Sequence, residues 1–233
     1  VEAIRQRQVA RWLKASAVCA VAAVLGICTN LSNLYHTWEY QKESMRGKSE
    51  LVKKNTATQT SSGLDRDYIT QWSYGIDETM TLLVPDAKGG ASAPLSQNST
   101  AMKHADSNVE QMLPTIYDSM PQYFGTQPGT SGPVYVGAFV LFLFILGLFI
   151  VKGPMKWALL AATIFSILLS WGKNFMPLTD FFIDYVPMYA KFRTVASILV
   201  VAEFTIPLLA ILALKRIVDE PDLLRQKMRW VYV

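Results

Sequence analysis

The sequence predicts an all-α membrane protein with four transmembrane helices and a long extracytoplasmic loop that carries short interfacial helices. The first supporting observation is composition: of 233 residues, 51% are hydrophobic and only 17% are charged, and the mean hydropathy is +0.22. Soluble domains carry about 25% charged residues, so the shortage of charge argues against that class. The second is that four apolar segments reach the roughly 17 to 25 residues that a bilayer crossing requires. The third is that the basic residues gather in a few short stretches.

The chain divides in order into crossings and loops. We expect a basic segment at residues 1–14, then alternating crossings and loops, and finally a second basic segment at 215–233; the crossings are 15–35, 134–151, 155–172 and 194–214, and the loops are 36–133 and 173–193. Only Lys152, Gly153 and Pro154 separate the second crossing from the third, which suits a tight helical hairpin with proline near the next helix start. The last crossing reaches about 31 Å at about 1.5 Å per residue, which matches a hydrocarbon layer of about 30 Å.

The distribution of charge predicts the orientation. Eleven basic residues flank the crossings on one side, which we expect to be cytoplasmic and to hold both ends of the chain; they are Arg5, Arg7, Arg11, Lys14, Lys152, Lys156, Lys215, Arg216, Arg225, Lys227 and Arg229. The long loop on the other side has eight basic and eleven acidic residues. The net charge of +4 is therefore a topology signal, and a nucleic-acid partner is not expected.

The start of the chain is neither a methionine nor a signal peptide, because a basic stretch leads directly into an apolar run of full crossing length. We therefore expect an internal fragment of a longer protein. The two cysteines, Cys19 and Cys28, lie inside that apolar run, which excludes a disulfide framework or a cysteine metal cluster.

The long loop contains an aromatic, amphipathic stretch at 68–85, which we expect to lie at the membrane interface. Gly89 and Gly90 follow it, and glycines allow the backbone to approach a ligand closely. A phosphate cradle and a plain loop both remain open there.

The short loop is rich in aromatic residues and carries charges of both signs. Asp180 and Asp184 are four residues apart and would share one face of a helix. Lys191 and Arg193 end the loop where the fourth crossing begins, so they are candidates for binding a lipid-linked phosphate. Headgroup anchoring, or an ion pair with the two aspartates, is an equal alternative.

Glu203 lies about ten residues into the fourth crossing. A carboxylate within the bilayer is unfavourable, so we expect Glu203 to face the helix bundle and to have a partner or a proton. Pro207 follows four residues later and is expected to kink the helix. A functional acid and an interhelical hydrogen bond both remain open.

Three stretches of the chain resemble the YfhO family of bacterial multi-spanning membrane proteins, in the form found in Bacteroidetes. They are GLDRDYITQWSYGIDETMTLLVPDAKGGAS at 63–92, QPGTSGPVYVGAFVLFLFILGLF at 127–149 and SWGKNFMPLTDFFIDYVPMYAKFRTVASILVVAEFTIPLLA at 170–210. The resemblance covers about residues 60–215, with the order and spacing of the stretches intact. It implies part of an inner-membrane protein similar to GT-C glycosyltransferases, which move a sugar from a polyprenyl-phosphate carrier to a cell-envelope glycan acceptor. It also implies that the catalytic acid lies outside this fragment.

Such an enzyme needs a base or a metal-assisted carboxylate, and positive charge for the departing phosphate. Lys191 and Arg193 suit the phosphate, while Asp77, Glu78 and Asp86 could approach the acceptor. The expected partners are membrane lipids, the polyprenyl-linked sugar and the glycan acceptor, and a divalent metal is compatible with this chemistry. The alternatives are a transporter or flippase that uses Glu203 and Pro207, or a non-catalytic membrane assembly component.

Overall fold

The computed structural model describes residues 8–44, 64–94, 104 and 121–223. The chain forms two compact units, residues 1–54 and 55–233. The expected segments 1–14, 36–133 and 215–233 therefore lie partly outside the described residues.

The first unit contains two consecutive helices, α2 (Val9–Cys28) and α3 (Leu31–Tyr40). Every residue of α2 is exposed within this unit, and its apolar length would suit a lipid environment. The helix ends at Thr29, whose hydroxyl donates to the carbonyl of Gly26 at 2.7 Å. The expected crossing at 15–35 therefore begins earlier, at Val9, and is interrupted before α3.

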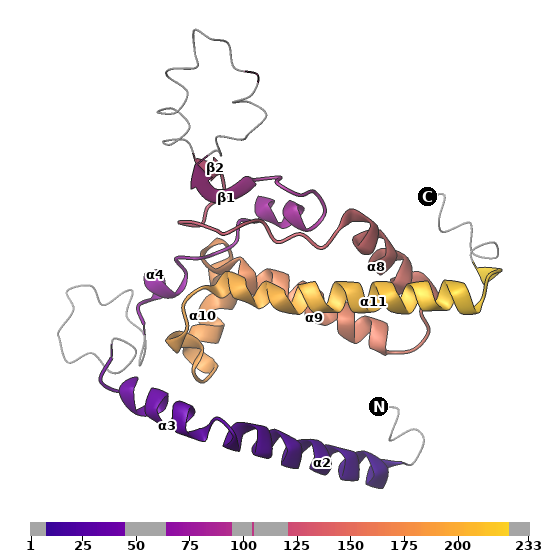
Figure 1. The fold of residues 1–233 in the computed structure, drawn as a ribbon, viewed down its shortest axis with the longest axis horizontal. Coiled ribbons are helices and arrows are strands. Elements are labelled where there is room, and N and C mark those ends of the chain that lie inside the picture. Colours follow the sequence, from indigo (N-terminus) through magenta and orange to yellow (C-terminus); the bar gives the residue numbers. More distant parts are fainter. Residues whose placement is uncertain (1–7, 45–63, 95–103, 105–120, 224–233) are drawn as a thin grey trace. The chain divides into compact units, whose positions relative to one another are not determined.

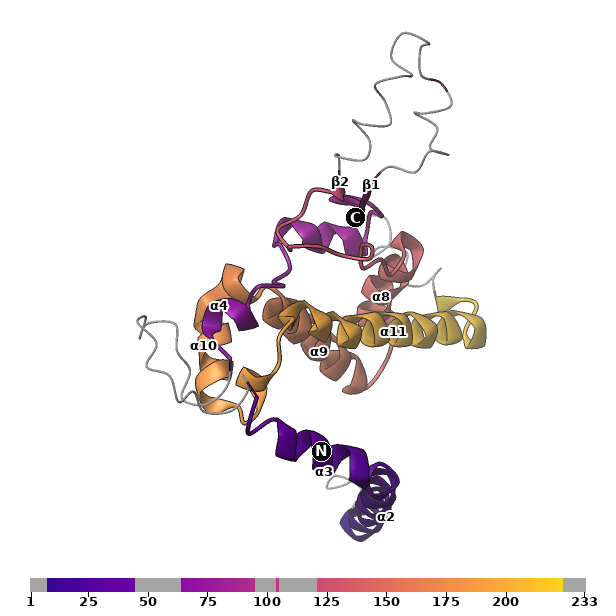
Figure 2. The ribbon, with the colours of Figure 1, turned by 60° about the vertical axis from the view of Figure 1, so that its left-hand side comes forward.

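Three helices pack together in the second unit: α8 (Ala138–Ile150), α9 (Met155–Ser170) and α11 (Val200–Asp219). They lie side by side in both views of the ribbon (Figures 1 and 2). A Cβ on Gly147 of α8 would lie 3.0 Å from the Leu209 side chain of α11, so the small residue allows close helix packing. The hydroxyls of Thr163 and Thr205 join α9 to α11 at 2.7 Å.

The structure supports a membrane protein but does not confirm four crossings. Within the described residues, two helices are long and apolar enough to cross a membrane: α2, and a helix over Val195–Asp219 that joins η4 (Val195–Leu199) to α11. A third span is reached only if α9 and the segment Gly172–Tyr185, which bends away by 109°, are counted together. The 13 residues of α8 extend about 20 Å, which is short of the hydrocarbon thickness of about 30 Å.

The bend after α9 forms at a glycine. Gly172 has a φ of +44°, and a Cβ there would lie 2.1 Å from the hydroxyl oxygen of Ser73. Only glycine at position 172 therefore lets the loop that contains Ser73 pack this closely against the end of α9. Most of the expected loop at 173–193 is helical, since it contains η2 (Gly172–Phe175), α10 (Met176–Tyr185) and η3 (Tyr189–Lys191).

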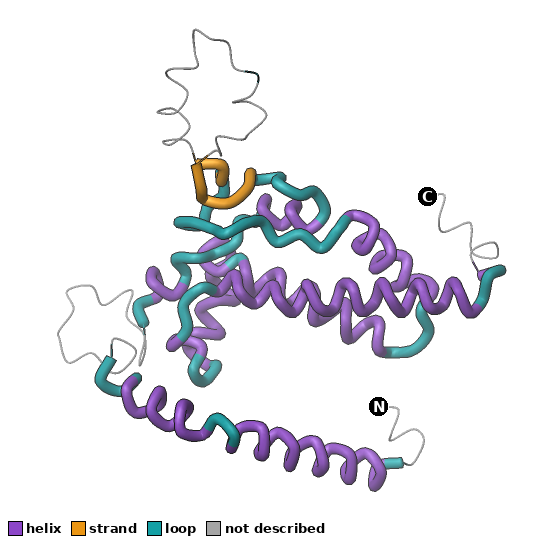
Figure 3. The backbone as a smooth tube through the Cα atoms, in the orientation of Figure 1, coloured by secondary structure: helices purple, strands orange, loops and turns teal. Residues whose placement is uncertain are grey.

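The described part of the long loop packs onto the end of this bundle. It contains α4 (Arg66–Ile69), η1 (Asp77–Leu82) and an antiparallel pair of strands, β1 (Gly89–Pro94) and β2 (Pro121–Tyr123). Figure 3 colours the strands orange and the helices purple. The amide of Tyr74 donates to the carbonyl of Ser170 at 2.8 Å, and the amide of Ala196 donates to the carbonyl of Trp72 at 3.1 Å. Within the stretch 68–85, Ile69, Tyr74 and Leu82 are buried against protein, whereas Ile76, Met80, Leu83 and Val84 are exposed.

Candidate functional site

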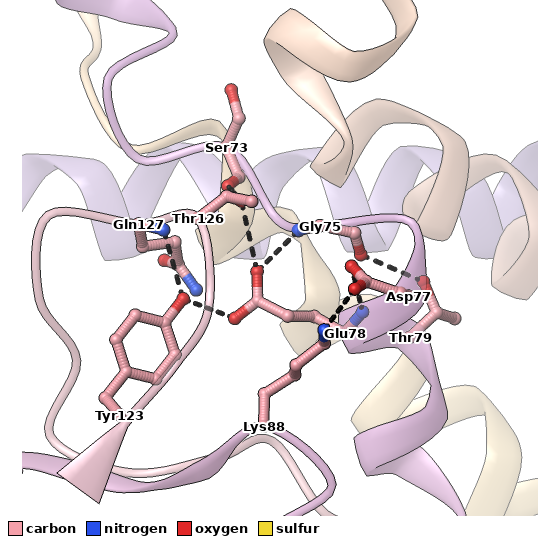
Figure 4. Close-up of polar contacts among 9 residues, drawn as sticks. All are labelled: Ser73, Gly75, Asp77, Glu78, Thr79, Lys88, Tyr123, Thr126 and Gln127. Carbon is pink, nitrogen blue, oxygen red and sulfur yellow. Dashed lines mark hydrogen bonds and ion pairs between the residues drawn. The ribbon is translucent and has the colours of Figure 1, made fainter.

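A buried carboxylate, Glu78 of η1, joins separate parts of the long loop. Its residue is only 2% exposed. One carboxylate oxygen accepts the amide of Gly75 at 2.6 Å and the hydroxyl of Thr126 at 3.4 Å, while the other accepts the hydroxyl of Tyr123 (Figure 4). Both oxygens therefore have donors, which is the condition under which a buried charge is tolerated.

Tyr123 connects Glu78 to the turn after β2. Its oxygen also accepts the amide of Gln127 at 3.0 Å. Burial, and then the hydrogen bond to Glu78, raises the pKa of Tyr123 to about 12. The phenol therefore stays protonated at physiological pH and remains a donor to the carboxylate.

Asp77, the residue before Glu78, has the opposite environment. It is exposed and forms an ion pair with Lys88 (Figure 4). The hydrogen bond from Lys88 lowers the pKa of Asp77. The charge of Lys88 is thereby held beside η1.

A cavity of about 220 Å³ with both polar and apolar lining atoms, called the polar cavity below, lies next to this network. Glu78 and Lys88 supply charges to its lining, Tyr74 and Tyr123 supply rings, and Ser197 of η4 closes one side. Hydroxyl groups and tyrosine rings in this arrangement can receive a small polar ligand that carries several hydroxyls.

A second cavity, of about 310 Å³, is mostly apolar. Phe192, Ile198 and Val200 line it together with Arg193, and Ser197 lines it as well as the polar cavity. The two cavities therefore share Ser197 in their linings. Residues of η4 thus contribute to both linings.

Arg193 is held at the apolar cavity by aromatic rings. Its guanidinium lies 4.1 Å from the ring centre of Trp72 and 5.0 Å from that of Tyr68, and it donates to the Tyr68 hydroxyl. The residue is exposed, and no ion pair to it occurs among the described residues. Stacking orients the planar group while leaving its charge available to an anion.

The residue after Arg193 has a strained backbone. Thr194 takes a φ of +77° and a ψ of +64°, a left-handed conformation that is unfavourable for a β-branched residue. Such strain is of order 1–3 kcal/mol and is retained where the surroundings fix it. Thr194 lines the apolar cavity, so this strained turn between Arg193 and η4 lies at that cavity.

Asp180 and Asp184 do share one face of a helix, α10, as their spacing predicted. Both carboxylates pair with Arg66 of α4, and the contact to Asp184 is 2.6 Å. The alternative in which these aspartates pair with Lys191 or Arg193 is therefore wrong. Their role in the structure is to hold α4 against α10.

Of the remaining predicted residues, Gly89 lines the polar cavity, whereas Lys191 and Asp86 line neither of the two cavities. Lys191 ends η3 and does not line the apolar cavity, and its ammonium makes no hydrogen bond or ion pair within the described part of the chain. Asp86 is exposed in a turn with a φ of +57°. Gly89 has a φ of +80°, and a Cβ there would lie 1.7 Å from the carbonyl oxygen of Gln122. The backbone that approaches this glycine closely is thus that of β2.

The expectation that Glu203 faces the bundle is wrong for the helices described. Glu203 is exposed on α11, because that helix presents Ala202, Ile206 and Leu209 to α8 and α9. It forms no hydrogen bond or ion pair with another described residue. The helix continues through Pro207 to Asp219.

Sequence reasoning missed the residues that orient the charged groups. The sequence does not identify Arg66, Tyr68 or Trp72 individually, although the aromatic character of residues 68–85 is a signal for the two rings under Arg193. Within the described ranges, no group of three or more His, Cys, Asp and Glu side chains is placed to hold a metal ion.

No protein-family model, curated protein or solved structure matches this chain.

Proposed function

We propose that this chain is part of a polyprenyl-phosphate-sugar-dependent membrane glycosyltransferase that acts on a cell-envelope glycan. The observation that carries the proposal is the position of Arg193, an exposed guanidinium without an ion-pair partner among the described residues, at an apolar cavity that shares Ser197 with the polar cavity. A lipid-linked sugar has the same order of parts, an isoprenoid chain, a phosphate and a sugar. The family resemblance of residues 60–215 supports the same substrate class.

Each part of the donor has a counterpart in this arrangement. The apolar cavity takes the isoprenoid units next to the phosphate, and Arg193 binds the phosphate through charge-assisted hydrogen bonds. The polar cavity beside Ser197 takes the sugar, whose hydroxyls can exchange hydrogen bonds with Tyr74 and Gln127. Lys191 is not part of this binding site.

The reaction in this proposal breaks the bond between the anomeric carbon and the phosphate oxygen, and it forms a bond from that carbon to an acceptor hydroxyl oxygen. The acceptor proton passes to a base, and polyprenyl phosphate leaves with the bonding electrons. Arg193 stabilises the negative charge that develops on the phosphate. Glu78 is a poor choice of base, because both of its oxygens already accept hydrogen bonds. The base is assigned to a part of the protein outside this chain, as the resemblance implies.

The proposal also fixes a topology. Arg193 faces the envelope side of a bacterial inner membrane, both ends of the chain are cytoplasmic, and the short apolar helix α8 belongs to one of four crossings. The transporter alternative needs Glu203 to line a path between helices, and its exposed position on α11 does not favour that role.

The proposal can be tested with polyprenyl phosphate and the corresponding polyprenol, titrated into the purified protein in detergent micelles and measured by native mass spectrometry. The wild type is expected to prefer the phosphate. Arg193→Gln should weaken phosphate binding about 10- to 100-fold, since a hydrogen bond to a charged group contributes about 1.5–3 kcal/mol. Arg193→Lys should retain part of the preference, because the charge stays but the planar fork is lost.

Arg11→Gln is the matched control, since it removes the same charge from the exposed surface of α2. Equal binding of phosphate and polyprenol by the wild type, or an unchanged preference in Arg193→Gln, would refute the binding site. Envelope glycans from a deletion strain complemented with each variant test the transfer reaction itself. Normal glycans in the deletion strain would refute the enzymatic function.

A further inference from the structure

A third cavity, of about 280 Å³, lies at the opposite end of α11 from Arg193. Leu212, Lys215, Arg216 and Asp219 line it from one face of α11, because residues three, four and seven apart meet on a helix surface. Val151 and Lys152, directly after α8, complete the lining. Neither the donor site nor the Glu78 network uses any of these residues.

The lining combines an apolar floor with a cationic rim. Val151 and Leu212 are partly buried, whereas Lys152 and Lys215 are exposed. Three basic side chains and one acidic side chain line the cavity, so its charge is positive. Asp219 is the acidic member. The cavity therefore favours an anion that continues into an apolar group.

Arg216 adds an unsatisfied donor. One terminal nitrogen of its guanidinium pairs with Glu220 at 2.6 Å. Its Nε is buried and has no hydrogen-bond partner among the described residues. A buried donor without an acceptor is unfavourable, so an oxygen atom entering beside Arg216 would be stabilised.

Stabilisation of the C-terminal end of α8 does not account for the basic residues at this cavity. Cations are favourable near the C-terminus of a helix, and Lys156 already takes that role by donating to the carbonyl of Leu148 at 2.6 Å. A general excess of basic residues near a membrane boundary explains their number. It does not explain why Lys152, from the turn after α8, and Lys215, from α11, line one cavity.

We propose that this cavity binds the phosphate diester of an anionic glycerophospholipid. Lys152, Lys215 and Arg216 receive the phosphate oxygens, and the upper part of an acyl chain lies on Val151 and Leu212. Basic pockets between membrane helices bind phospholipid headgroups in this way. Free phosphate has the same oxygen chemistry, but the apolar floor favours the lipid. The proposal does not depend on the donor site.

The test uses the purified protein in a neutral detergent, with phosphatidylglycerol, phosphatidylcholine and inorganic phosphate as separate probes and bound molecules counted by native mass spectrometry. Phosphatidylglycerol is expected to bind most tightly. The double variant Lys152→Gln with Lys215→Gln should weaken its binding about ten-fold or more, since each basic residue near a membrane surface contributes about 1 kcal/mol of attraction to anionic lipid. Lys14→Gln with Lys42→Gln removes two charges elsewhere and should leave most of the binding.

Lys152→Gln alone provides a variant that is safe for folding, because Lys152 is exposed in the turn before α9. It should weaken phosphatidylglycerol binding about three- to five-fold. Unchanged binding in both Lys152 variants would overturn the site. Inorganic phosphate that binds as tightly as the lipid and displaces it would overturn the lipid assignment.

Discussion

Glu78 and Glu203 are carboxylates in contrasting surroundings: Glu78 is buried in η1, between Asp77 and Thr79, whereas Glu203 is exposed on the apolar helix α11. The loop around Glu78 supplies an amide and two hydroxyl groups as donors. The helix around Glu203 supplies none, because its backbone amides are already bonded within the helix. Glu78 is therefore buried where donors are available, and Glu203 is exposed where they are not.

The comparison also separates two kinds of role. Glu78 fixes the position of Tyr123, which lines the polar cavity. It also fixes the turn that contains Thr126. Glu203 fixes nothing within the described bundle. Substitution of Glu78 should therefore lower the free energy of unfolding, whereas substitution of Glu203 should leave it nearly unchanged and make membrane insertion more favourable.

The largest effect is expected for Glu78→Ala, which should lower the free energy of unfolding by about 3 kcal/mol. The change leaves the Tyr123 hydroxyl and the Gly75 amide without their acceptor, and loss of one partner from a buried charged network has an effect of this order. Denaturant unfolding in micelles, followed by tryptophan fluorescence, measures it. Trp171 is a suitable reporter because its indole N–H donates to Thr79 of η1 at 2.9 Å.

Asp86→Asn is the control for this substitution, since it removes an exposed acid from the same loop and asparagine tolerates the left-handed backbone there. It should change stability by less than about 0.5 kcal/mol. Equal effects of Glu78→Ala and Asp86→Asn would show that the burial of Glu78 has no energetic consequence.

A smaller effect is expected for Tyr123→Phe, which removes one donor from Glu78 and should destabilise by about 1–2 kcal/mol near neutral pH. The folded protein favours the neutral phenol, so the pKa of Tyr123 is raised from 10.0 to about 12. Its stabilisation is complete below pH 10.0 and is lost as the pH rises through about 12. Unfolding measured across this range should show the wild type approaching the variant, and a constant difference would contradict the hydrogen bond.

Helix positions could be predicted from hydropathy, because an apolar run reports an average over many side chains. The runs at 134–151 and 155–172 contain α8 and α9, and the run at 194–214 overlaps η4 and α11. The ends were less accurate, since they depend on local backbone geometry. The interruption at Thr29 and the bend at Gly172 have no clear hydropathy signal.

The site was predictable only where a local pattern existed. The spacing of Asp180 and Asp184 predicted their shared face, but their partner Arg66 lies 114 residues before Asp180. Glu78 and Tyr123 are 45 residues apart and belong to no common motif. Contacts of this kind depend on how the loop packs against the bundle, and residue spacing in one sequence does not contain that information.

The smallest effect on the free energy of unfolding is expected for Glu203→Leu. The same substitution should make membrane insertion more favourable. Because Glu203 has no described hydrogen-bond partner, the free energy of unfolding in micelles should change by less than about 0.5 kcal/mol. Insertion of residues 195–219 by the translocon should become more favourable by roughly 2–3 kcal/mol, since a charged side chain is replaced by leucine. A glycosylation-tag insertion assay measures this change. Destabilisation of the folded protein by more than about 1 kcal/mol would contradict the comparison, because it would mean that Glu203, like Glu78, depends on a donor that its folded surroundings supply.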